Sequence, residues 1–215
     1  NDGNDSDGNP VFENTNQNFT KYKGGDIEFV DVDQDGWLDV AVTGVSPDGR
    51  KSELYMNQEG VFFELNTNYV VEGLSQSDME WADLDNDSDQ DLIITGIDKD
   101  NRNQALYYTN LGNFNFFKEE LFRNQSEGVQ RGEIDIIDRD KDGDNDLFIT
   151  GVSGDSNQNI SRRDYSNTYY YNNPNNNVNV GLVDGNTEYL DIDGDGELDY
   201  LSIGRQDGNS EEVFI

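Results

Sequence analysis

The chain of 215 residues contains no cysteine, no histidine and only three prolines. Without cysteine it has no disulfide, no thiolate metal site and no cysteine nucleophile. Without histidine it has no Ser-His-Asp triad and no imidazole metal ligand. Bases are also scarce, because 14 Lys and Arg stand against 46 Asp and Glu, a net charge of −32. Nucleic acid is therefore not expected as a partner, since binding it requires a basic surface.

Long apolar runs are missing too. No run approaches the roughly 18 residues of a transmembrane helix, so we expect no transmembrane segment, and no signal peptide is visible at the start of the chain. A hydrophobic content of 33% with this net charge is typical of disordered chains. Against disorder stand 11 Tyr, 11 Phe and 2 Trp. The positions of the acids decide between the two interpretations.

The acids are concentrated in four nine-residue segments that align without gaps. The segments begin at Asp31, Asp83, Asp138 and Asp191, which are 52, 55 and 53 positions apart. Positions 1, 3, 5 and 9 are aspartate in every copy, and position 6 is glycine except for Ser88. Self-similarity at this period is typical of a repeat architecture.

Short stretches rich in Val, Ile, Phe and Tyr flank each segment and predict β-strands. In the third repeat, the third strand is expected at Thr168–Tyr171. Four antiparallel strands in each repeat of this length predict an all-β fold, a β-propeller of four-stranded blades. The last repeat lacks a fourth strand, and Val11–Asn14 resembles the fourth strand of the first repeat. We therefore expect four blades in this chain, with the N-terminal strand closing the last blade.

The expected domains are a flexible acidic tether over residues 1–10 and a propeller over residues 11–215, with repeats that start near residues 26, 78, 133 and 186. Three interpretations of the blade count stay open. The chain could form a closed ring of four blades, belong to a longer array, or join a second chain in a ring of eight.

Four carboxylates on one nine-residue turn are suited to calcium, which binds six to eight hard oxygen ligands. Glycine at position 6 permits a left-handed backbone, and the carbonyl of position 7 supplies a further oxygen. The alternative interpretation is an acidic turn without metal, which four copies in register make less favourable. We expect about four calcium ions, one in each blade. The candidate ligands are Asp31, Asp33, Asp35, Trp37, Asp39, Asp83, Asp85, Asp87, Asp89, Asp91, Asp138, Asp140, Asp142, Asp144, Asp146, Asp191, Asp193, Asp195, Glu197 and Asp199.

The pattern D-x-D-x-D-G-x-x-D, followed by an apolar strand and Thr-Gly, resembles the FG-GAP/VCBS repeat family, which includes the integrin α-subunit propeller and many bacterial surface proteins. The resemblance covers about residues 11–215 and implies a calcium-binding β-propeller outside the cell. It also implies roles in adhesion, in ligand or carbohydrate binding, or as an accessory module of enzymes. Such propellers usually have seven or eight blades, so the four repeats of this chain depart from the family pattern.

Other residues recur or cluster outside the loops. An acid three positions before each loop predicts a ring around a central channel, unless these side chains face solvent: Glu28, Glu80, Asp135 and Glu188. An apolar residue two positions before each loop is expected in the core between blades: Phe29, Trp81, Ile136 and Tyr189. Arg162, Arg163 and Tyr165 are a candidate ligand-binding cluster, although this region also suits an ordinary strand.

The predicted function is a calcium-stabilised extracellular binding or adhesion module without catalytic activity. Its cysteine-free composition favours a location outside the cell or at the cell surface of a bacterium. Its partner would be a protein or a glycan, or copies of the chain itself. One alternative is a structural subunit of a surface fibre or multimer. The other is a polysaccharide-active enzyme or its accessory domain, with tyrosine and arginine handling protons.

Overall fold

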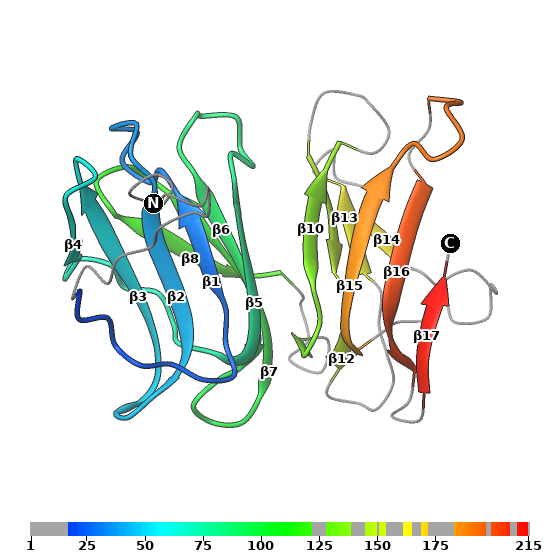
Figure 1. Cartoon of the computed structure of the whole chain (residues 1–215), viewed down its shortest axis with the longest axis horizontal. Coiled ribbons are helices and arrows are strands. Elements are labelled where there is room, and N and C mark those ends of the chain that lie inside the picture. Colours follow the sequence, from blue (N-terminus) through cyan, green and yellow to red (C-terminus); the bar gives the residue numbers. More distant parts are fainter. Residues whose placement is uncertain are drawn as a thin grey trace, which may run out of the picture.

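The computed structural model of the chain describes residues 17–121, 128–138, 145–149, 151–153, 161–164, 169–171, 183–196, 199–206 and 210–214. All the regular secondary structure in these residues consists of β-strands, which pair antiparallel in four sheets (Figure 1). The all-β class expected from the sequence is therefore confirmed. The expected tether and the N-terminal strand Val11–Asn14 lie outside the described residues.

The first two sheets follow the order of the chain. The first sheet consists of β1 (Ile27–Val30), β2 (Asp39–Ser46), β3 (Gly49–Gln58) and β4 (Phe62–Leu65). The second consists of β5 (Ser75–Ala82), β6 (Asp91–Ile97), β7 (Asn103–Asn110) and β8 (Phe116–Glu120), and the short strands β9 (Val129–Gln130) and β12 (Val152–Ser153) extend it beyond β7.

The other two sheets repeat this order with shorter or fewer strands. The third sheet consists of β10 (Ile134–Ile137), β11 (Asp146–Ile149), β13 (Ser161–Asp164) and β14 (Tyr169–Tyr171). The fourth consists of β15 (Val183–Leu190), β16 (Asp199–Gln206) and β17 (Ser210–Phe214).

One strand assignment from the sequence was wrong. Thr168–Tyr171 was expected to be the third strand of its repeat, but β14 is the fourth and pairs with β13, which in turn pairs with β11. The sequence of β13 is Ser-Arg-Arg-Asp and has no apolar residue, so its composition does not indicate a strand. This strand forms because its backbone pairs with that of β11. The residue types of β13 give no sign of this pairing.

The second sheet is buried on both faces, which explains its continuous apolar runs. Leu92 and Ile94 of β6 pack toward the first sheet, in a cluster with Ala41 and Leu54. Ile93, between them in the sequence, packs toward the third sheet. Successive side chains of a strand point to opposite faces, so the run Leu-Ile-Ile supplies both cores. Each sheet therefore serves as the packing partner of the next.

Trp81 and Ile136 pack against these cores as predicted, and Tyr189 makes an edge-to-face contact with Phe148 at 5.6 Å between ring centroids. Phe29 is the exception, because 61% of its surface is exposed. The prediction that Phe29 lies in a core is therefore wrong for this structure, in which none of the described sheets covers that face of β1.

A threonine-glycine pair on the second strand lets neighbouring backbones approach closely. Thr43 is fully buried, and its hydroxyl accepts a hydrogen bond from the backbone N–H of Leu74 at 3.2 Å, which links the first sheet to the segment before β5. The following glycines have left-handed φ angles, +143° at Gly44 and +142° at Gly96. A Cβ atom on Gly96 would lie 2.9 Å from the carbonyl oxygen of Ser75.

We expect Gly96→Ala to lower the free energy of unfolding by more than about 2 kcal/mol, because it combines a strained φ angle with a backbone clash. Gly49→Ala is the matched control, since Gly49 also has a positive φ, +115°, but open space around it. Strain alone predicts a loss of about 1 kcal/mol there. Urea denaturation of both variants measures the difference, and equal losses would contradict the close approach at Gly96.

Candidate metal loops

The four aspartate segments occupy equivalent places in the sheets. They join β1 to β2, β5 to β6, β10 to β11 and β15 to β16, so each connects the first strand of a sheet to the second. Side chains also link neighbouring loops: the Gln34 amide donates a hydrogen bond to the carbonyl oxygen of Ser88 at 2.7 Å, and the Asn145 amide donates one to the carbonyl oxygen of Asp83 at 3.3 Å. The first three loops therefore lie together at one end of the molecule.

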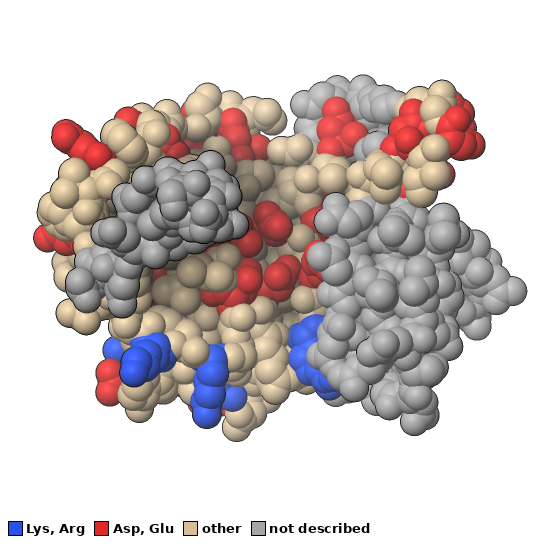
Figure 2. All heavy atoms as spheres, viewed as in Figure 1, with Lys and Arg blue, Asp and Glu red and all other residues tan. Residues whose placement is uncertain are grey.

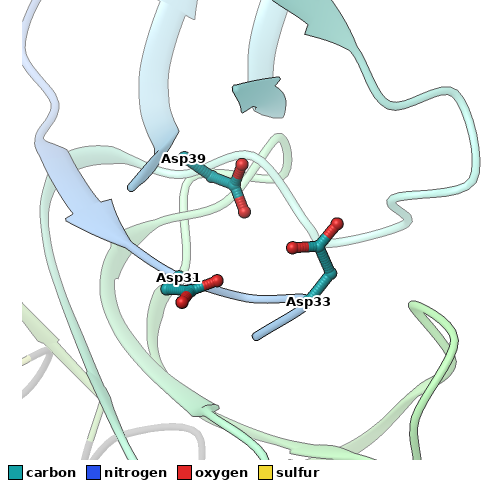
Figure 3. Close-up of side chains that lie close together, drawn as sticks. All are labelled: Asp31, Asp33 and Asp39. Atoms are coloured by element: carbon teal, nitrogen blue, oxygen red, sulfur yellow. The ribbon is translucent and has the colours of Figure 1, made fainter. Parts of the chain in front are cut away.

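Three of the loops bring the carboxylates of positions 1, 3 and 9 together. In each group, one oxygen from every carboxylate lies within 4.8 Å of the others. Figure 3 shows the first group, in which the three side chains point into a common space between β1 and β2. The groups are Asp31, Asp33 and Asp39; Asp83, Asp85 and Asp91; and Asp191, Asp193 and Asp199.

The same backbone hydrogen bonds hold each group. The position 1 carboxylate accepts one from the N–H of position 6, at 2.9–3.0 Å in all three loops (Gly36, Ser88 and Gly196). The position 9 carboxylate accepts one from the N–H of position 2, at 3.0–3.2 Å (Val32, Leu84 and Ile192). The loop is thus closed around its carboxylates by its own amides.

Left-handed residues curl the loop at two positions, of which the sequence indicated only one. Position 6 has φ of +89°, +78° and +91° at Gly36, Ser88 and Gly196. Ser88 therefore adopts the conformation of the glycines it replaces. Position 4 is also left-handed, with φ of +59° at Gln34 and +62° at Asn86. Glutamine gives no signal for this conformation, whereas asparagine tolerates it better than most residues.

The position 9 aspartates are the buried members of the first two groups, with exposed fractions of 1% for Asp39 and 0% for Asp91. Burial above all, with a contribution from the carboxylates of Asp33 and Asp35, raises the pKa of Asp39 to about 6, although hydrogen bonds from Asn57 and Val32 lower it. Burial also raises the pKa of Asp91. A divalent cation in the loop would favour the charged carboxylates instead.

The donor set fits calcium. Oxygen ligands lie 2.3–2.6 Å from this ion, so ligands on opposite sides of it are up to about 5.2 Å apart. The carboxylate oxygens of each group lie within 4.8 Å of one another, close enough to share one such ion. All three donors are hard carboxylate oxygens. Magnesium holds its ligands closer, at about 2.0–2.1 Å, in strict octahedral geometry.

The remaining candidate ligands lie in different places. The position 5 carboxylates are outside the three groups and accept hydrogen bonds from the N–H of position 7, at 2.8 Å from Trp37 to Asp35 and at 2.9 Å from Asp89 to Asp87. Asp195 donates its N–H to Asp193 at 3.1 Å. In the third loop, Asp138 and the buried Asp146 are described. Asp140, Asp142, Asp144 and Glu197 lie outside the described residues.

Acids also gather on the innermost strands, which face the central hollow where Figure 2 shows Asp and Glu side chains. Burial above all, together with the charges of Glu28 and Asp135, raises the pKa of Glu80 to about 7. Three of the four residues predicted to ring a channel are therefore close enough to interact. For the fourth, Glu188, the structure describes the backbone alone.

Two further aspartates, Asp26 and Asp78, join neighbouring sheets. They were not singled out from the sequence. The Asp26 carboxylate accepts a hydrogen bond from the N–H of Met79 at 3.1 Å, and the Asp78 carboxylate accepts one from the N–H of Ile134 at 2.6 Å. Each aspartate lies five positions before a loop and links its strand to the next innermost strand. The recurrence of an acid at this position was the available signal.

The candidate ligand-binding cluster stays a prediction. Arg162 and Arg163 lie on β13, where the structure describes the backbone alone, and Tyr165 lies outside the described residues. Arg162 pairs with Tyr170 and Arg163 with Tyr169 in the register of β13 and β14.

The inner acids predict a stability that falls as the pH rises. The folded chain keeps a proton on Glu80, and one on Asp78, whose pKa burial and Asp26 raise to about 8. The unfolded chain releases these protons above about pH 4.5, so both groups destabilise the fold progressively between pH 4.5 and 8. We expect Glu80→Gln to flatten this slope and to gain about 1–2 kcal/mol at pH 8, allowing for solvent screening.

Urea denaturation at several pH values and a fixed calcium concentration measures this effect. Glu119→Gln, an exposed glutamate on β8, is the control and should change stability little. A Glu80→Gln variant with the slope of the original chain would contradict the interaction between the innermost strands.

Comparison with known proteins identifies one stretch of the chain. The family model of the FG-GAP-like repeat matches residues 31–94, which contain the first two loops and the strands between them. Neither curated proteins nor solved structures give a match. Within the described residues we find no helix with the length and hydrophobicity that a membrane span requires. The segment from Asp31 to Ile94 is thus similar to the FG-GAP-like repeat.

Proposed function

We propose that the chain is a calcium-stabilised binding or adhesion module that works outside the cell and has no catalytic activity of its own. One observation carries the proposal: three loops in different sheets hold the same three carboxylates with the same backbone hydrogen bonds. A single acidic turn is common without metal, but repeated construction of one carboxylate cage favours a common ligand. A hard divalent cation is the ligand that such a cage suits best.

Calcium in each loop would offset the repulsion between its carboxylates. Two charges about 4 Å apart repel by about 4 kcal/mol at an effective dielectric constant of 20, and each group contains three such pairs. The position 9 aspartate ties the ion to the sheet, because Asp91 also accepts hydrogen bonds from the Tyr107 hydroxyl at 3.0 Å and the Asn110 N–H at 2.8 Å. Ion binding would thereby stabilise β6 and β7 together.

The proposed architecture is a β-propeller with four blades in this chain, each described sheet being one blade. The packing of the second sheet between the first and the third supports it, as does the order of the strands within each sheet. The N-terminal strand Val11–Asn14 would complete a fourth sheet of this kind, which has three described strands.

Such a module suits the outside of a cell, where calcium at millimolar concentration fills even weak sites. The linked loops would form one rigid end of the molecule, and a protein or glycan partner would bind a surface whose shape depends on calcium. The net charge of −32 keeps such a surface away from nucleic acids and other polyanions.

We expect calcium to raise the melting temperature by at least about 10 °C, because several sites each contribute about 2–3 kcal/mol when the ion is in hundredfold excess over Kd. Asp85→Asn makes the test sharper. Neighbouring acids Asp91 and Asp87, together with burial, raise the pKa of Asp85, so neutralising it should leave stability unchanged or higher at low calcium. At saturating calcium the same variant should melt about 5–10 °C below the original chain.

Calorimetry at low and high calcium measures both effects. Asp48→Asn, on an exposed turn between β2 and β3, is the control and should behave alike in both conditions. A melting temperature that changes neither with added calcium nor with chelator would overturn the metal assignment. A loss of stability by Asp85→Asn of the same size in both conditions would mean that Asp85 has a structural role only.

The binding function predicts capture of a partner that requires calcium. We expect the immobilised chain to retain a glycan or a protein from an array of cell-surface glycans and extracellular proteins in calcium, and to release it in chelator. The Asp85→Asn variant should need more calcium for the same signal. Turnover of an acidic polysaccharide by the purified chain would contradict a non-enzymatic module.

A further inference from the structure

An apolar face of the first sheet is open in this structure. Phe29 and Ile27 are 61% and 56% exposed, and they line a groove of about 540 Å³ together with Val40 and Val42. Phe19 closes the outer side of the groove, where its ring contacts Tyr55 at 4.8 Å and Phe63 at 5.6 Å between centroids. Exposed aromatic and aliphatic side chains gathered on one sheet face indicate an interaction surface.

The equivalent face is buried in the next two sheets. The repeat aligns Ile27, Phe29, Val40 and Val42 with residues that pack against the first sheet: Met79, Trp81, Leu92 and Ile94. The same positions in the third sheet pack against the second: Ile134, Ile136, Leu147 and Ile149. Each sheet therefore uses this face to contact the sheet that precedes it, and the first sheet has no preceding sheet in the described chain.

This equivalence defines what would cover the face. Its partner is the opposite face of a sheet of the same repeat, the face that the first sheet presents with Ala41 and Leu54 and the second with Ile93 and Ala105. The fourth sheet stands at the other end of the series, because its Tyr189 packs on Phe148 of the third. In Figure 1 the first and fourth sheets lie in opposite halves of the molecule.

We propose that the open face of the first sheet binds the fourth sheet of a second copy of the chain. The first sheet of each copy contacts the fourth sheet of the other. Two open arcs of four sheets thereby close into one ring, in which every one of these faces is covered. A reciprocal contact of this kind is closed and stops at two copies. The inference rests on the packing of the sheets and not on the occupancy of the loops.

Charge sets the conditions for this association. Each copy carries −32, and the inner acids Asp26 and Glu28 lie on β1 or next to it, so like charges oppose the approach of two copies. Salt screens such repulsion, whereas the apolar contact persists in salt. Association should therefore tighten as the ionic strength rises.

Sedimentation equilibrium of the 215-residue chain in calcium tests the proposal. The expected mass is twice that of the single 24.3 kDa chain. Phe29→Asp should weaken association by about thirtyfold or more, the effect expected for an aromatic residue at the centre of an interface. Phe117→Asp is the matched control, because Phe117 is 56% exposed on β8, away from the groove, and should leave association unchanged.

Circular dichroism melts of each variant show whether it folds, and Ile27→Asn replaces Phe29→Asp if that variant does not. A monomeric original chain at high salt overturns the proposal and would mean that the chain closes on its own fourth sheet or receives another partner. A dimer that Phe29→Asp does not weaken, or a mass above two copies, overturns it as well. The calcium melts report separately on the loops, so failure of the metal assignment is distinguishable.

Discussion

A buried aspartate at the end of each of the first two loops ties the loop to its sheet. One oxygen of Asp39 accepts the N–H of Val32 within the loop, and the other accepts the N–H of Asn57 on β3. Asp91 repeats the arrangement with Leu84 and Asn110. The carboxylate is needed at this place to satisfy backbone donors, yet it is buried and close to other acids. A cation in the loop is the simplest way to reconcile these two demands.

The sheets depend on one another in a similar manner. Ile93 and its neighbours Leu92 and Ile94 belong to two different cores, so the second sheet is stable only between two others. A sheet with two apolar faces always requires a partner on each side. The open face around Phe29 follows from the same rule, applied to the sheet at the start of the series.

Three populations of acids therefore act differently in this chain. Those in the loops gather in groups of three carboxylates, and Asp26 and Asp78 join neighbouring sheets through backbone donors. Burial and neighbouring charges raise the pKa of Glu28 and of Glu80, so these glutamates oppose folding when they are charged. Protons relieve this repulsion among the inner acids, and the proposed calcium ions would relieve the repulsion within the loops.

The sequence by itself determined the all-β class, the positions of the loops and the carboxylates of positions 1, 3 and 9. These features are local: nine residues with alternating acids and a left-handed position curl in one way, and short β-branched runs form strands. The sequence did not reveal the pairing of Ser161–Asp164, the links from Asp26 and Asp78, or the exposure of Phe29. Only the tertiary structure decided these. The pairing depends on the backbone of β11, whereas the links and the exposure of Phe29 depend on which sheet lies beside which face. That choice is made by contacts between residues more than fifty positions apart, and the local pattern of Phe29 is the same whether or not a neighbour covers it.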